Sequence, residues 1–260
     1  MIRDLLAFAL GTMVGSFLNV CIYRLPKAES IVFPGSHCGR CGKPVHWHDN
    51  IPVVSYLALG GRCRDCGGRF SAQYLCVEIL TGALFVFYYR YFGMSATGIT
   101  FLIFTLALLT QGVIDFHHKI IPDVITLPGI VAGLAASCLI PAICGAEFWW
   151  EGLRASAVGA VAGGGFLFLV AVVAEFILKK EAMGGGDVKL LAMIGAFLGL
   201  VGVAWVLLAA SLLGSVAGIY FRFIKREEEI PFGPFLGLAA ALYIFLGESS
   251  INWYFSLFRR

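Results

Sequence analysis

Long apolar runs alternate with short polar segments along most of the chain. A helix needs about 20 mostly apolar residues to cross a lipid bilayer. Runs of this kind occupy residues 5–23, 72–89, 98–114, 124–146, 155–174, 190–221 and 231–247, the last extendable to 258. The pattern predicts an all-α polytopic membrane protein.

The run 190–221 decides how many helices to expect. Its 32 residues carry no charge, and they are too many for one untilted span. Inside it, Gly199-Leu200-Val201-Gly202 suits a tight turn between two short helices. The sequence therefore predicts seven or eight transmembrane helices.

Composition removes several classes of protein. Apolar residues make up 59% of the chain and charged residues 13%, with a mean hydropathy of +0.87. A typical soluble domain is about 25% charged. A soluble globule, a disordered chain and a disulfide scaffold are excluded. The net charge of +3 gives no support to a nucleic-acid partner, so the expected surroundings are a lipid bilayer.

One polar insert, residues 24–71, separates the first helix (1–23) from the remaining transmembrane domain (72–260). It holds seven of the 19 Lys and Arg residues, and cytoplasmic loops collect such residues. The insert is therefore expected in the cytoplasm and the N-terminus outside. Residues 5–23 are read as a retained helix, because a cleaved signal peptide has a shorter apolar region and a small-x-small cleavage site.

Four cysteines in the insert form two Cys-x-x-Cys turns, Cys38 with Cys41 and Cys63 with Cys66, separated by 21 residues. Two such turns complete a tetrahedral four-sulfur site that suits zinc. Bound zinc would also stabilise an insert too small to form a core of its own. Disulfides or a redox pair are the alternatives, and a reducing cytoplasm disfavours both. We expect a structural, zinc-ribbon-like site.

Two aspartates border transmembrane runs, where acids are costly and point to function. Asp115 ends the run 98–114, and Asp187 precedes the run 190–221. Alternation of the helices places both at the cytoplasmic face, which would allow them to meet. Two close aspartates share a proton, so one can activate water while the other donates to an amide carbonyl. The alternative is that both merely cap helices, and the residues alone do not decide between the two roles.

Neighbouring residues carry further expectations. Gly184, Gly185 and Gly186 permit positive φ and a close approach by another backbone beside Asp187. Asp123 is expected to be the N-cap of the next helix. The cluster Gly159–Gly165 follows no strand and indicates close helix packing, not a phosphate loop.

The chain resembles the bacterial type 4 prepilin peptidases, membrane aspartic proteases of the Gly-x-Gly-Asp type. The second catalytic motif of that family is similar to Gly184-Gly185-Gly186-Asp187-Val188-Lys189, and the first to Asp115 followed by Ile121-Pro122-Asp123. Further similarity lies in the insert and its flanks, at Ser16, Asn19, Arg24, Pro26, Asn50, Ile51, Pro52, Ser55, Gly61, Arg62, Tyr74, Val77 and Glu78.

The resemblance implies an endopeptidase of the bacterial cytoplasmic (inner) membrane. It would remove the basic leader from prepilin or pseudopilin precursors, after a Gly, at the cytoplasmic face. Asp115 and Asp187 would be the catalytic pair, within an active-site loop that includes Gly184, Gly185, Gly186 and Lys189. Members with four cysteines commonly also methylate the new N-terminus with S-adenosylmethionine. The sequence shows no Rossmann-type loop for this donor, so its site is not assigned.

Two rival functions are weighed beside this one. A carboxylate-gated transporter or channel with a structural zinc insert would need acids near the bilayer midplane, whereas these lie at helix ends. A zinc-ribbon interaction module on a membrane anchor would need a single helix, and this chain has at least seven apolar runs.

Overall fold

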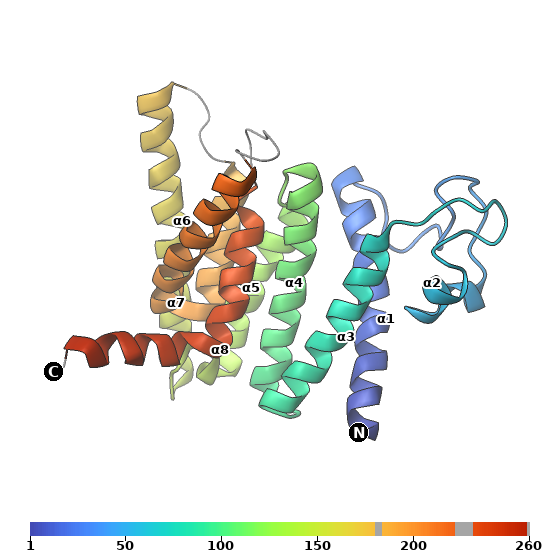
Figure 1. Ribbon diagram of the computed structural model, residues 1–260. Coiled ribbons are helices and arrows are strands. Elements are labelled where there is room, and N and C mark those ends of the chain that lie inside the picture. Colours follow the sequence, from blue (N-terminus) through green and yellow to red (C-terminus); the bar gives the residue numbers. More distant parts are fainter. Residues whose placement is uncertain (180–183, 222–230, 259–260) are drawn as a thin grey trace. The chain divides into compact units, whose positions relative to one another are not determined.

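The computed structural model describes residues 1–179, 184–221 and 231–258. These residues form helices and no strands (Figure 1). The α-helices are α1 Ile2–Arg24, α2 Val54–Ala58, α3 Ala72–Phe92, α4 Ala96–His118, α5 Asp123–Leu139, α6 Trp149–Leu178, α7 Gly185–Tyr220 and α8 Gly233–Phe258. Six of the described helices are long and apolar enough to cross a membrane, and α5 is a shorter apolar helix. The prediction of an all-α polytopic membrane protein is confirmed.

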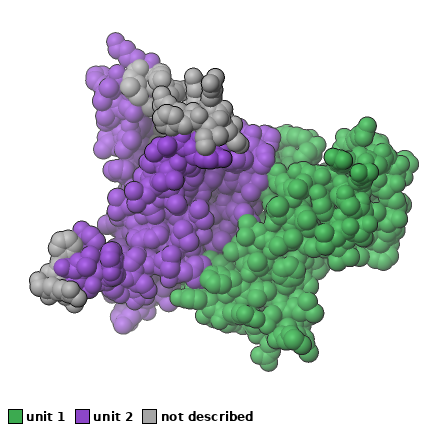
Figure 2. All heavy atoms as spheres, viewed as in Figure 1, with its two compact units in different colours: residues 1–102 green, residues 103–260 purple. Residues whose placement is uncertain are grey.

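The chain divides into two compact units, coloured separately in Figure 2: unit 1 is Met1–Leu102 and unit 2 is Ile103–Arg260. In unit 1, α1 packs along α3 through glycines. A Cβ added at Gly11 would lie 2.7 Å from the Cα of Gly82, and one added at Gly15 would lie 2.8 Å from the Cα of Glu78. Small residues allow the two backbones this close approach.

In unit 2, glycines likewise allow α6 and α7 to pack closely. A Cβ at Gly159 would collide with the backbone of Gly195 and Gly199, and a Cβ at Gly163 with the carbonyl of Leu191. The hydroxyl of Ser156 donates to the Ala196 carbonyl across the same contact. The glycine cluster of α6 therefore serves helix packing, as the sequence predicted.

Helix α7 is broken at Gly199, where φ is 66° and ψ is −175°. A straight helix of its 36 residues would be about 54 Å long, far beyond the roughly 30 Å bilayer core. The first arm packs on α6, whereas the second packs on α8, where Trp205 donates to Ser250 and Gly214 faces Phe235. The turn predicted at residues 199–202 thus occurs at its first glycine. With the break, the described chain has eight apolar helical segments.

The span predicted at 124–146 is too long. Helix α5 ends at Leu139, and Pro141 starts a 3₁₀ turn, Pro141–Cys144. A residue before proline is pushed out of the helical region, and Ile140 has φ −134° and ψ 72°.

Candidate functional site

The carboxylate of Asp115 is buried in unit 2, one turn before the end of α4. Its side chain is 5% exposed, and Oδ2 accepts a hydrogen bond of 3.1 Å from the backbone N–H of Gly233. Gly233 is the first residue of α8, so this N–H has no partner inside its own helix. Asp115 therefore does cap a helix, but a different one from its own.

Asp187 is the third residue of α7, half-buried, with Gly184 at the N-cap position. It is not the N-cap that the alternative reading required. Its Oδ1 is buried and has no hydrogen-bond partner among the described residues. The residue before Asp187, Gly186, packs on Ile121, which also contacts the Gly233 that binds Asp115. The structure thus brings together two acids that are 72 positions apart in the sequence.

Ile121, which follows α4, packs against the starts of both α7 and α8. A Cβ at Gly186 would lie 2.9 Å from the Ile121 Cβ, and a Cβ at Gly233 would lie 3.1 Å from its Cδ1. The Cβ at Gly233 would also lie 2.5 Å from Oδ2 of Asp115. The starts of α7 and α8 therefore converge on the end of α4, with their N-terminal dipoles near the two carboxylates.

The three glycines before Asp187 differ in their surroundings. A Cβ at Gly185 would meet nothing within 4 Å, and a Cβ at Gly184 would only reach the nitrogen of Gly186, at 4.0 Å. None of the three has a positive φ, so the structure does not use the positive φ that glycine permits. Open space beside Gly184 and Gly185 leaves room for another backbone, while Gly186 is closely packed.

Lys189 binds Asp123 instead of facing the two acids. Its Nζ lies 2.7 and 2.8 Å from the two carboxylate oxygens of Asp123. Asp123 is the first residue of α5, with Pro122 at the N-cap position, so the prediction of Asp123 as N-cap is wrong. This ion pair ties the first turn of α7 to the start of α5 and so restrains Asp187.

In unit 1 the four predicted cysteines form one cluster. Their Sγ atoms all lie within 4.8 Å of one another, and those of Cys38 and Cys66 are 3.8 Å apart. Zn–S bonds of about 2.3 Å in a tetrahedron put sulfurs about 3.8 Å apart. The cluster has the donor atoms and the spacing that a zinc ion requires. No imidazole of His37, His46 or His48 belongs to it.

Both cysteine turns share one backbone pattern. In the first turn, Cys38 N–H donates to the Lys43 carbonyl, and the Cys38 carbonyl accepts from Gly42 N–H. In the second turn, Cys63 N–H donates to the Gly68 carbonyl, and the Cys63 carbonyl accepts from Gly67 N–H. The N–H groups of Cys41 and Arg40 lower the pKa of the Cys38 thiol to about 6. Amides aimed at sulfur favour the thiolate, which is the form that binds metal.

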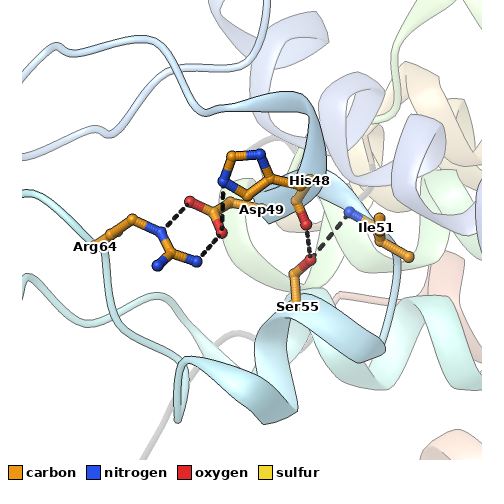
Figure 3. A network of polar contacts seen from close by, with 5 residues as sticks. All are labelled: His48, Asp49, Ile51, Ser55 and Arg64. Carbon is orange, nitrogen blue, oxygen red and sulfur yellow. Dashed lines mark hydrogen bonds and ion pairs between the residues drawn. The ribbon is translucent and has the colours of Figure 1, made fainter.

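A polar network fixes the second turn to the middle of the insert (Figure 3). Arg64 makes a bidentate pair with Asp49, at 2.8 and 2.6 Å, and this guanidinium holds the pKa of the Asp49 carboxyl below its usual value. The hydroxyl of Ser55 donates to the His48 carbonyl and accepts from Ile51 N–H. The insert is thereby cross-linked without a sizeable apolar core.

Sequence reasoning missed Gly233, because nothing local to it shows that α8 begins beside Asp115. It also expected a Lys or a Tyr hydroxyl as the partner of Glu78, and the structure shows a backbone N–H instead. The Glu78 carboxylate accepts from Val53 N–H at 2.7 Å. A helix-start signal, Gly233-Pro234 before an apolar run, marked the position of Gly233 but not its contact.

Comparison with known proteins gives two adjacent family matches. Residues 9–92 match the bacterial peptidase A24 N-terminal domain, and residues 102–219 match the type IV leader peptidase family. The chain is 35% identical to a prepilin leader peptidase/N-methyltransferase of Pseudomonas aeruginosa over 94% of its length and 91% of the relative's. A protein of the same name from Neisseria gonorrhoeae is 33% identical over 96% and 93%.

A third protein of this name, from Myxococcus xanthus, is 41% identical over 82% of this chain. The match spans 61% of that relative's length. No solved structure matches the chain.

Proposed function

The chain belongs to the type IV leader peptidase family, and we propose that it removes the leader peptide from prepilin or pseudopilin precursors and then methylates the new N-terminal residue. The observation that carries the proposal is the convergence of Asp115 and Asp187 at the starts of α7 and α8, where Gly186 and Gly233 both pack on Ile121. The proposed cleavage needs no covalent intermediate between the substrate and the enzyme.

Asp115 and Asp187 form the catalytic pair in this proposal. Two neighbouring carboxylates hold one proton between them, because the negative charges of two ionised carboxylates would repel each other. The ionised one takes a proton from water as the oxygen attacks the scissile carbonyl carbon, and the other protonates the carbonyl oxygen. The Gly233 N–H fixes the rotamer of Asp115, and the Lys189–Asp123 pair fixes the start of the helix that carries Asp187.

The open space beside Gly184 and Gly185 is the proposed path of the substrate backbone. An extended peptide there could reach the pair without meeting a side chain from these two positions. Gly186 and Lys189 complete the active-site loop by packing and ion pairing, not by touching the substrate.

Zinc in this proposal is structural. Cys38, Cys41, Cys63 and Cys66 would hold it, and it would stabilise the insert. S-adenosylmethionine supplies the methyl group: the free amine bonds to the methyl carbon, the S–C bond breaks with its electrons staying on sulfur, and one proton is released.

We place the enzyme in the bacterial inner membrane, with the insert and the aspartates on the cytoplasmic side. Eight segments give 14 Lys and Arg inside and five outside, in the direction of the positive-inside rule. Residues 1–23 form the first membrane helix, 24–71 the zinc insert and 72–260 the peptidase domain. The rival transporter hypothesis has no support from the three relatives named above, each of which carries the peptidase name.

The test is incubation of the purified protein with a purified prepilin and S-adenosylmethionine, read by intact-mass spectrometry. The expected product lacks the leader and carries one added methyl group on its N-terminal residue. An intact prepilin after prolonged incubation, with a protein that is monodisperse and zinc-loaded, would overturn the proposal. A cleaved but unmethylated product would remove its second half.

A further inference from the structure

Unit 1 contains a pocket of about 510 Å³ that is separate from the two aspartates and borders the cysteine cluster at Cys38, and we propose that it binds the S-adenosylmethionine methyl donor. The inference rests on the proposed methyltransferase function and gives it a site. The pocket lies among the end of α1, the start of α3 and the insert, and all of its lining belongs to unit 1.

The size of the pocket suits a ligand of this class. Sites for small molecules and cofactors span roughly 300 to 1,000 Å³ and combine apolar walls with a few fixed polar groups. This pocket has three tyrosines, two acids and four arginines in its lining: Tyr23, Tyr56, Tyr74, Asp49, Glu78, Arg24, Arg40, Arg62 and Arg69.

These groups match the three chemical parts of the donor. The tyrosine rings offer faces for adenine and for the sulfonium cation. The Glu78 residue is only 7% exposed and the Asp49 side chain 8%, so both carboxyl groups lie in a sheltered site. Asp49 is already paired with Arg64, which leaves Glu78 as the acid that can face a cationic part of the donor. Among the described residues, the guanidinium groups of Arg40, Arg62 and Arg69 make no hydrogen bond or ion pair, which leaves them available to the α-carboxylate of the donor.

The walls of the pocket are held in place before any ligand binds. Val53 is the centre of a γ-turn, with φ 63° and ψ −52°, closed by Val54 N–H donating to the Pro52 carbonyl at 2.6 Å. A β-branched residue at positive φ is strained, and the turn aims the Val53 N–H at Glu78.

Two further side chains from α1 fix the other wall. Arg24 donates to the carbonyls of Ser30, Pro34 and Gly35, and Asn19 donates to the carbonyl of Tyr74. A pre-formed wall reduces the entropy that a ligand would otherwise lose in ordering it.

The pocket also accounts for residues that carry the family resemblance but have no part in cleavage or in the metal cluster. Ser16, Asn19, Arg24, Ser55, Tyr74 and Glu78 all line it. A basic leader peptide is a poor occupant, because its several cations would face four arginines and only two acids, whereas the donor carries a carboxylate that an arginine can bind. A molecule with a carboxylate, an aromatic ring and a cationic centre uses every group present.

The test measures donor binding without prepilin. Equilibrium dialysis of tritiated S-adenosylmethionine against the full-length protein in detergent compares Glu78→Gln with Glu29→Gln, and Arg69→Gln with Lys43→Gln. The first of each pair loses a charge that lines the pocket, and the second loses the same charge from an exposed position outside it. Because hydrogen bonds to charged groups are worth about 1.5–3 kcal/mol, the pocket variants should bind at least about tenfold more weakly, and the controls within about twofold of wild type.

Ultraviolet cross-linking of the same donor to the wild type locates the site even if a pocket variant loses its zinc or fails to fold. We expect the labelled peptide to lie within residues 16–78. A label elsewhere, unchanged binding by both pocket variants, or displacement of the donor by a synthetic leader peptide would overturn the inference. Wild type that cleaves prepilin but binds no donor refutes the pocket alone, whereas donor binding at the pocket without cleavage refutes the proposed peptidase alone.

Discussion

Asp115 on α4 accepts a hydrogen bond from the backbone N–H of Gly233, 118 positions later and the first residue of α8. The contact joins a buried acid to a helix N-terminus, where free N–H groups and the helix dipole both favour a carboxylate. It also requires a glycine, because any Cβ at residue 233 would lie within 2.5 Å of the acid oxygen.

Gly233→Ala should therefore disable the enzyme by moving Asp115 and not by unfolding α8. Displacing a catalytic group by about 1 Å can cost on the order of 100-fold in rate, and we expect a loss of kcat of that size in prepilin cleavage. Gly237→Ala is the matched control in the same helix, because its Cβ would make ordinary contacts of 3.5 Å with Leu108. Equal activity of the two variants would show that the Gly233 contact does not position Asp115.

The ion pair of Lys189 with Asp123 should act on activity more than on stability. Both side chains are well exposed, at 39% and 53%, and exposed pairs contribute at most about 1 kcal/mol. Asp123→Ala and Lys189→Ala should each lower kcat several-fold with little change in the melting temperature. The exchanged double variant, Asp123→Lys with Lys189→Asp, should regain most of the loss; additive losses would mean that the pairing is incidental.

The sequence predicted features that depend on local pattern. Apolar runs marked the membrane helices, glycines marked the break at residue 199, and cysteine spacing marked a cluster whose sulfurs the structure brings together. It could not predict the contacts that tertiary packing makes. The ion pair of Asp123 with Lys189 and the hydrogen bond from Val53 N–H to Glu78 depend on which segments meet in the folded chain.

Helix lengths were also only partly predictable. Hydrophobicity continues from 124 to 146, but Pro141 ends α5 early because backbone sterics prevail over apolar pattern there. The Asp115–Gly233 contact had no local signal at all, since the helix that supplies the N–H begins 118 positions away.

Cys63→Ser should release the metal and loosen the insert. Wild type should contain about one zinc per chain, and the variant less than about a fifth of that, because three sulfurs leave the tetrahedral site incomplete. Metal analysis together with limited proteolysis of residues 24–71 would record both effects. Cys76→Ser is the control, an exposed cysteine on α3 outside the cluster. Wild type with no bound metal would contradict the zinc assignment.

The break at Gly199 predicts where the end of α8 lies. Eight segments place it outside the cytoplasm with the insert inside, whereas a seven-segment chain would return it to the cytoplasm. A reporter enzyme that is active only outside the cytoplasm, fused after Phe258, should therefore be active, and the same reporter inserted at Gly39 should be silent. A silent fusion after Phe258 would mean that α7 crosses the membrane once.

The catalytic role of the two aspartates is tested by prepilin cleavage with Asp115→Asn and Asp187→Asn, with Glu147→Gln as the control at an exposed loop position. Asn keeps the shape of each side chain but can neither hold nor release the proton that the pair shares. We expect each Asn variant to be monodisperse, to bind zinc and to cleave at least about a thousandfold more slowly than wild type, while the control cleaves normally. Normal cleavage by either Asn variant would contradict that role.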